Sequence, residues 1–331
     1  MPTETLFEVA RHNFDTPEFR GIECIEVEAK SVINRVPGGA LPFDWTINPY
    51  RGCTHACTYC FARPTHTFLD MDAGRDFETK IVVKVNAPEV LRRELAARRW
   101  KGEHIAMGTG TDPYQRVEGR YRLMRRILEA LIDFRNPFSV LTKGTMILRD
   151  VDLLQRAAET ASVNAAFSIG TLDERVWRET EPGTPHPKAR IEAVRTLTEA
   201  GIPTGVLMAP VLPGISDSRH QMRAVVDAAL EAGATHVSPI VLHLRPGVRE
   251  QFMPWLEEHH PDLVERYRRL YPKAYASAEE RRTLTRRVEN LIASARRRRP
   301  EGPGNGLPQR FHRGTPEHRA PTPVQPTLFE G

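Results

Sequence analysis

Residues 48–63 read NPYRGCTHACTYCFAR, and this stretch places Cys53, Cys57 and Cys60 in the pattern C-x-x-x-C-x-x-C. Cysteine thiolates hold iron–sulfur clusters, normally four to each 4Fe-4S unit, so a set of three leaves one iron with an open coordination position. Three closely spaced cysteines among only four in the chain indicate metal chemistry in a reducing compartment rather than a disulfide framework. The stretch therefore predicts a 4Fe-4S cluster on these three thiols.

Two other interpretations use the same cysteines. One is a zinc site with His55 or His66 as its fourth ligand, and the other is a set of buried thiols without metal. Zinc sites more often present two ligand pairs separated by a longer stretch, and no second pair follows here. The spacing favours the cluster.

The chain around the cysteines alternates short apolar runs with longer helical patterns, which is typical of βα units with parallel strands. We expect an α/β fold, a partial (β/α)6 barrel of the TIM type, in which residues 44–47 form the first barrel strand and deliver the cysteine loop. Further strands are expected at 81–85, 105–108, 138–141, 165–169, 203–208 and 237–242, and helices at 88–100, 121–134, 150–159, 187–200 and 219–232.

Shifts in composition divide the chain into four parts. Residues 1–42 are interpreted as an N-terminal extension, 43–245 as the barrel and 246–299 as a C-terminal helical cap with interleaved aromatic residues. Residues 300–331 are rich in Pro, Gly and Arg with few apolar residues, which predicts a disordered tail.

Charge and hydropathy narrow the class of protein. The chain has no apolar run long enough to span a membrane, and Glu4, Glu8 and Arg11 interrupt the start where a signal peptide would be apolar, so we expect a cytoplasmic protein. A net charge of +5 and a pI of about 9.1 are compatible with an anionic partner, either nucleic acid or a phosphorylated small molecule.

The cysteine stretch resembles the radical S-adenosylmethionine (radical SAM) superfamily, and within it the spore photoproduct lyase-like group. The signature is this cysteine spacing with an aromatic residue, here Tyr59, before the last cysteine; the stretch departs from the group at Phe61, where tyrosine is usual. The resemblance extends over residues 29–244. It implies that the cysteines bind a 4Fe-4S cluster whose open iron chelates S-adenosylmethionine, and that reductive cleavage gives a 5'-deoxyadenosyl radical that abstracts hydrogen from a substrate.

More cofactor contacts are expected at the C-terminal ends of the barrel strands. Residues 108–115 read GTGTDPYQ, and the resemblance implies that this strand end touches the cofactor, although Asp112-Pro113 also suits an ordinary turn. The resemblance also implies a lysine that pairs with the cofactor carboxylate, and the alternative for each strand-end residue is a solvated polar side chain. The expected cofactor contacts are Tyr59, Thr109, Thr111, Asp112, Lys143, Ser168 as a hydrogen-bonding group and Arg190 as a carboxylate-binding fork.

One departure limits what the resemblance implies. Photoproduct lyases carry a cysteine as hydrogen donor in the strand that here reads GTGTDPYQ, and the matching position is Thr109. The fourth cysteine, Cys24, lies far upstream, and a lone cysteine is usually a small buried hydrophobe. Photoproduct repair is therefore not carried over to this chain, and the reaction stays open.

The C-terminal end offers two hints of nucleic acid. Arg296 to Arg299 form a basic run, which either meets phosphates or ends a solvated helix. Gln325, Leu328 and Phe329 resemble the short peptide with which bacterial proteins dock on the DNA polymerase sliding clamp.

We therefore expect a radical SAM enzyme with DNA as the leading candidate substrate, and by resemblance a ferredoxin or flavodoxin as reductant. Two other classes stay open. The chain could be a non-enzymatic zinc- or nucleic-acid-binding protein with structural cysteines, or a redox sensor that holds a cluster without cleaving S-adenosylmethionine.

Overall fold

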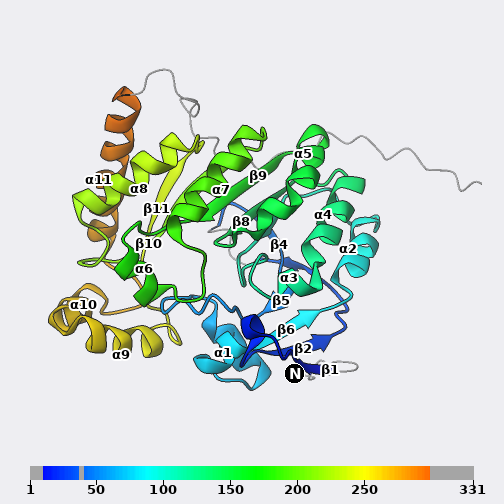
Figure 1. Cartoon of the computed structure of the whole chain (residues 1–331), viewed down its shortest axis with the longest axis horizontal. Coiled ribbons are helices and arrows are strands. Elements are labelled where there is room, and N and C mark those ends of the chain that lie inside the picture. Colours follow the sequence, from blue (N-terminus) through cyan, green and yellow to red (C-terminus); the bar gives the residue numbers. More distant parts are fainter. Residues whose placement is uncertain (1–9, 37–40, 299–331) are drawn as a thin grey trace, which may run out of the picture.

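The computed structural model describes residues 10–36 and 41–298. Within them a seven-stranded sheet forms the body of the protein, with the strand order β11-β10-β9-β8-β7-β4-β3 (Figure 1). Neighbouring strands run parallel except for β3, which is antiparallel to β4. The sheet has two separate edges, β11 and β3, so the expected partial barrel is confirmed as an open one. The strands are β3 (Ile33–Arg35), β4 (Trp45–Ile47), β7 (Ile105–Met107), β8 (Phe138–Thr142), β9 (Val163–Ser168), β10 (Thr204–Val211) and β11 (Val237–Val241).

Helices in the connections between strands cover one face of this sheet (Figure 1). Each buries an apolar face, as Leu128 and Leu131 of α4 show. Gly201 and Gly233 follow α7 and α8 with φ of +82° and +84°, the left-handed conformation in which many helices end. These helices are α2 (Ala87–Leu95), α4 (Leu123–Asp133), α5 (Val151–Thr160), α7 (Pro187–Glu199) and α8 (Arg219–Glu231).

One expected barrel strand belongs to another sheet. The run 81–85 forms β6 (Lys80–Lys84), which pairs with β2 and β5 in a four-stranded sheet of order β1-β2-β6-β5. Its placement in the barrel was wrong. An apolar run such as this one, with Ile81 and Val83 buried, predicts a strand but does not determine which strands pair with it. Strand β4, at the residues expected as the first barrel strand, lies in the seven-stranded sheet next to β7. The other strands of the small sheet are β1 (Ala10–Asn13), β2 (Glu23–Val27) and β5 (Tyr50–Arg51).

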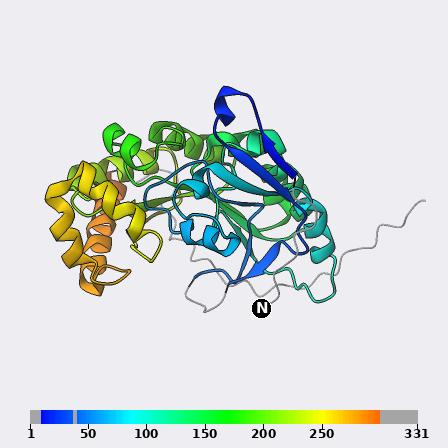
Figure 2. The ribbon, with the colours of Figure 1, turned by 90° about the horizontal axis from the view of Figure 1, so that it is seen from below.

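The C-terminal helices gather at the β11 end of the sheet (Figures 1 and 2). Phe252, Tyr267 and Tyr271 are buried among them and belong to the main core. Helix α11 packs along α8 and β11. The segment comprises α9 (Arg249–His259), η4 (Pro261–Leu263), α10 (Val264–Leu270) and α11 (Ala278–Arg298), and the remaining elements are η1 (Pro17–Phe19), η2 (Arg63–Leu69), α1 (Arg75–Thr79), α3 (Glu118–Tyr121), η3 (Thr145–Asp150) and α6 (Glu174–Thr180).

No helix in the described part of the chain is both long and apolar enough to cross a membrane. The expected disordered tail, with the clamp-like residues Gln325, Leu328 and Phe329, lies outside the described residues. The four-part division of the chain stays a prediction.

Candidate functional site

The cysteine loop follows β4 and β5 at the C-terminal edge of the parallel strands. Gly52 opens the loop with φ of +81°, and a Cβ there would lie 2.9 Å from both the Phe77 carbonyl oxygen and the His66 ring. The same Phe77 oxygen accepts a hydrogen bond from Cys53 N at 2.9 Å. Glycine is therefore required where the chain turns from β5 toward the first cysteine.

The three thiols are gathered and free of disulfides. Cys53 and Cys57 are buried and Cys60 is partly exposed. Burial raises the pKa of Cys57 to about 12 and the pKa of Cys53 well above its ordinary value, and the neighbouring thiols add to both increases. In the protein alone these thiols hold their protons, so a metal has to displace them on binding.

The cysteines suit a cluster better than a single metal ion. In residues 10–36 and 41–298, no three His, Cys, Asp or Glu side chains lie close enough together to hold one ion. Each candidate fourth ligand for zinc has one ring nitrogen with another partner: His66 Nε2 lies 3.0 Å from the Lys80 carbonyl oxygen, and His55 Nδ1 lies 3.3 Å from Asp112 Oδ2. Among the described residues, His66 Nδ1 is buried without a hydrogen-bond partner. A four-iron cluster spreads its thiolates over several irons, so the donor set of three cysteines fits it.

Arg63 holds the cysteine loop through hydrogen bonds to backbone carbonyl oxygens. Its guanidinium is 2% exposed and donates to the Cys57 carbonyl oxygen from Nε at 3.1 Å and from Nη2 at 2.8 Å. The same group donates to the Gly74 carbonyl oxygen at 3.1 Å and pairs with Glu78. Arg63 thereby ties the middle of the loop to α1 and adds positive charge beside the thiols.

Gln115 holds the other side of the loop. It is fully buried, and its Nε2 donates to the Gly52 carbonyl oxygen at 3.0 Å while its Oε1 accepts from Thr54 N at 2.9 Å. Thr111 Oγ1 also donates to the Gly52 oxygen, at 2.7 Å. One side-chain amide therefore bridges the two residues that flank Cys53.

Asp112 organises the strand end that follows β7. Its carboxylate accepts from Lys143 N and from Thr142 Oγ1, both at 2.6 Å, and pairs with His55. Burial would raise the pKa of Asp112, but these contacts outweigh burial and hold the pKa at about 2. The carboxylate is therefore charged and joins the cysteine loop to the ends of β7 and β8. Thr109, near the same strand end, is half-buried.

Lys143 brings an ammonium group toward the thiols. Its Nζ donates to Ser168 Oγ at 2.9 Å and lies 5.5 Å from the centre of the Tyr59 ring. Burial disfavours the charged form, but the negative charges of Cys57, when its thiol is deprotonated, and of Glu181 outweigh burial and raise the pKa of Lys143. Predicted residues from two strand ends, Lys143 and Ser168, and Tyr59 of the loop thus meet around one cation.

A buried ion pair lies behind Tyr59. The Tyr59 hydroxyl donates to Glu181, and Glu181 pairs with Arg190, which is 1% exposed. Arg190 also donates from Nη1 to the Ser168 carbonyl oxygen at 2.8 Å. Burial would raise the pKa of Glu181, but Arg190 and Lys143 outweigh burial and lower it. Arg190 therefore uses its fork within the protein, and a direct cofactor contact stays a prediction.

The segment after α6 closes on the cysteine loop. Gly183 N donates to the His55 carbonyl oxygen at 3.1 Å, and Thr58 N donates to the Thr180 carbonyl oxygen at 3.0 Å. A Cβ on Gly183 would lie 2.1 Å from the Thr54 carbonyl oxygen. Backbone contacts of this kind place Glu181 beside Tyr59. Sequence reasoning had passed over Glu181 and Gln115 as site residues.

Comparison with known proteins agrees with this arrangement. The family model described as the radical SAM superfamily matches residues 47–226. An uncharacterized protein of Mycobacterium tuberculosis is 45% identical over 316 residues, which cover 95% of this chain and 90% of that protein. A protein of Pseudomonas phage M6 named radical SAM Nalpha-GlyT isomerase is 26% identical over 190 residues, 57% of this chain and 37% of the phage protein.

Among solved structures, spore photoproduct lyase complexed with dinucleoside spore photoproduct has a similar fold. Its TM-score is 0.59 at 16% sequence identity, and the match covers 83% of this chain and 79% of the lyase chain.

Proposed function

We propose that this chain, which belongs to the radical SAM superfamily and therefore uses a 4Fe-4S cluster with S-adenosylmethionine, holds the cluster on Cys53, Cys57 and Cys60. The observation that carries the proposal is the gathering of three free thiols beside the Lys143 ammonium at the C-terminal edge of a parallel sheet. When bound, the cluster and S-adenosylmethionine supply radical chemistry, in which a carbon–sulfur bond is cleaved reductively and a hydrogen atom is abstracted.

The protein's own side chains bind and orient these groups. Lys143 is positively charged and close to Cys57, so it suits a carboxylate of the cofactor, and Ser168 lies next to it as a hydrogen-bonding group. Tyr59 is held in place through Glu181, which Arg190 orients. We place these residues at the cofactor, together with Thr109, Thr111 and Asp112 at the end of β7.

We further propose that the substrate is nucleic acid and that the reaction is a modification or a repair. The net charge of +5 supports a polyanionic partner. The solved structure of similar fold is described with a dinucleoside photoproduct, and the phage relative is also a radical SAM protein. An oxygen-sensitive cluster suits the cytoplasm, where a ferredoxin or a flavodoxin would supply electrons.

The test is anaerobic turnover. The full chain is reconstituted with iron and sulfide, reduced with dithionite and given S-adenosylmethionine, and 5'-deoxyadenosine is quantified with and without a DNA oligonucleotide. The proposal expects 5'-deoxyadenosine in both samples and more of it with the correct nucleic acid. A cluster-loaded protein that forms none would make the chain a redox sensor, and a protein that binds zinc but no iron would contradict the cluster assignment.

A further inference from the structure

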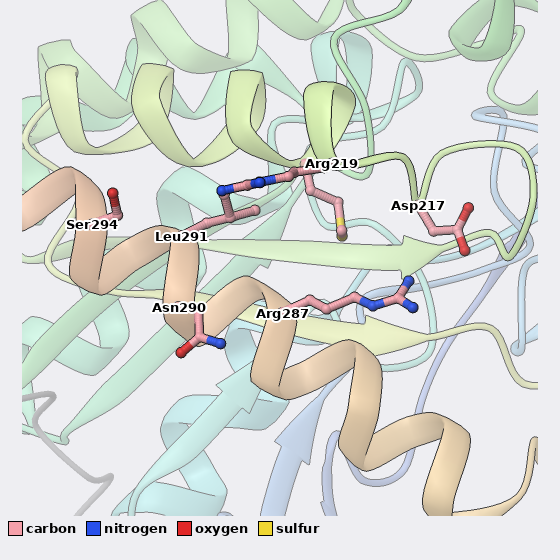
Figure 3. A pocket seen from close by; sticks show the side chains of 7 residues that line it. Asp217, Arg219, Arg287, Asn290, Leu291 and Ser294 are labelled. Carbon is pink, nitrogen blue, oxygen red and sulfur yellow. The ribbon is translucent and has the colours of Figure 1, made fainter.

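A pocket of about 290 Å³ lies between α8 and α11, outside the cysteine site (Figure 3). Buried Met222 and Leu291 contribute apolar side chains to it. Its size suits a small polar group rather than a whole cofactor. The lining residues are Asp217, Arg219, Met222, Arg287, Asn290, Leu291 and Ser294.

The pocket is positively charged. Arg219 and Arg287 are exposed and reach into it from facing helices, and neither guanidinium has a hydrogen bond or ion pair with any residue that the structure describes. Asp217 is the one carboxylate in the lining, and it has partners: Oδ1 accepts from Gly214 N at 2.7 Å, and Oδ2 lies 3.9 Å from Arg266 Nη2. The pocket therefore has a net positive charge, because its one carboxylate already has partners and its two guanidinium groups have none among the described residues.

One end of the pocket, at Asp217 and the guanidinium group of Arg287, lies at the C-terminal edge of the parallel strands, the edge that carries the cysteine loop (Figure 3). Helix α8 begins at Arg219, soon after the C-terminal end of β10, and the cysteine loop follows the C-terminal end of β4. In the sheet β10 stands four places from β4, which corresponds to roughly 19 Å at about 4.8 Å per strand. A nucleic-acid strand advances about 3.4 Å per nucleotide, so about six nucleotides span this distance.

We infer that the pocket between α8 and α11 binds a backbone phosphate of the nucleic acid whose target nucleotide lies at the cysteine site. This inference rests on the proposed function. A phosphodiester is anionic and its free oxygen atoms accept hydrogen bonds from guanidinium groups, and Arg219 and Arg287 bring positive charge to the pocket from two helices (Figure 3). Asn290 and Ser294 add neutral hydrogen-bonding groups on the α11 side. The contact carries no base specificity and sets how far along the strand the target lies.

The chain offers a matched pair of variants. Arg219→Gln with Arg287→Gln removes two charges from the pocket, and Arg223→Gln with Arg286→Gln removes two exposed charges from the same helices outside the lining. Binding of a fluorescent single-stranded DNA to the cluster-loaded full chain is measured by anisotropy at several salt concentrations. The pocket variant is expected to raise Kd about tenfold or more and to lower the salt slope by about 0.7, the value for one phosphate contact on a single strand, against a rise in Kd below about threefold for the control.

Equal losses in the two variants, or no loss in the pocket variant, would overturn the inference. Competition by inorganic phosphate alone separates the sources of the anion: if the pocket variant loses phosphate binding but keeps its Kd for DNA, the pocket takes a free anion and the inference fails. Formation of 5'-deoxyadenosine without DNA is followed in parallel and should be equal in all three proteins. If the unmodified chain forms no 5'-deoxyadenosine, the proposed function is contradicted. The Kd values of the variants for DNA can still be compared in that case.

Discussion

Gln115 determines the local geometry of the first cysteine. Its amide satisfies the Gly52 carbonyl oxygen and Thr54 N at once. Gln115→Leu keeps the volume but leaves the buried Thr54 N unpaired, at about 1–3 kcal/mol, while the Gly52 oxygen keeps its bond from Thr111 Oγ1. We expect a lower free energy of unfolding, and a changed electron paramagnetic resonance signal of the reduced cluster because Cys53 is no longer held in one position.

Gln155 provides the control for this substitution. It is exposed on α5 and donates from Nε2 to the Ala200 carbonyl oxygen at 3.0 Å, and it makes no hydrogen bond with the cysteine loop in the described part of the chain. Gln155→Leu should leave the cluster signal unchanged. If Gln115→Leu gives the same spectrum and iron content as Gln155→Leu, Gln115 has no positioning role.

Local spacing was enough to identify the cysteines but not their supports. The pattern from Cys53 to Cys60 lies in one short stretch, so it is visible in the sequence. Gln115 and Glu181 act on partners 61 and 122 residues away, Thr54 and Tyr59. Neither contact is visible in the sequence, because each partner lies far along the chain. Only the folded sheet brings them to the loop.

The loop between α6 and α7 depends on a buried ion pair. Glu181 and Arg190 are almost completely buried, whereas Glu174 and Arg178 form an exposed pair on α6. Glu181→Ala leaves a buried guanidinium uncompensated, so we expect the free energy of unfolding to fall by about 3–5 kcal/mol. Glu174→Ala should lower it by at most about 1 kcal/mol, since exposed pairs contribute little. Anaerobic denaturant titration of both variants measures the difference.

If Glu181→Ala and Glu174→Ala lower the free energy of unfolding equally, the pair of Glu181 and Arg190 is as exposed to water as the surface pair of Glu174 and Arg178. If only Glu181→Ala lowers the free energy of unfolding, and it also lowers the iron content, the result agrees with the contacts that join this loop to Tyr59 and His55.

Most elements were predictable because their periodicity is local, whereas the partner of one strand was not. Helices expected at 187–200 and 219–232 are present as α7 and α8, each ended by a glycine with positive φ. The apolar run 81–85 predicted a strand, yet β6 lies in the small sheet with β2. A buried run shows that both faces are covered, and the order of strands depends on contacts that the run itself does not contain.

The molecule as a whole concentrates its chemistry on one edge of an open sheet. Parallel strands present their C-terminal ends together, so the cysteine loop, Asp112, Lys143 and the start of α8 lie on the same side. The small sheet supports the loop at one end, and the C-terminal helices stand at the β11 end (Figure 2).

The fourth cysteine supplies the control for the central claim. Cys24 lies on β2, fully buried, and burial raises the pKa of its thiol to about 11, so it behaves as part of the core. Its substitution should leave iron binding intact.

The most direct measurement is therefore the yield of 5'-deoxyadenosine from anaerobically reconstituted, dithionite-reduced protein, compared among single Ala variants of Cys53, Cys57, Cys60 and Cys24. The account predicts that each of the first three substitutions abolishes both the cluster and the product, and that Cys24→Ala keeps both. A full cluster with normal product in Cys57→Ala, or no product from the unmodified cluster-loaded chain, would contradict it.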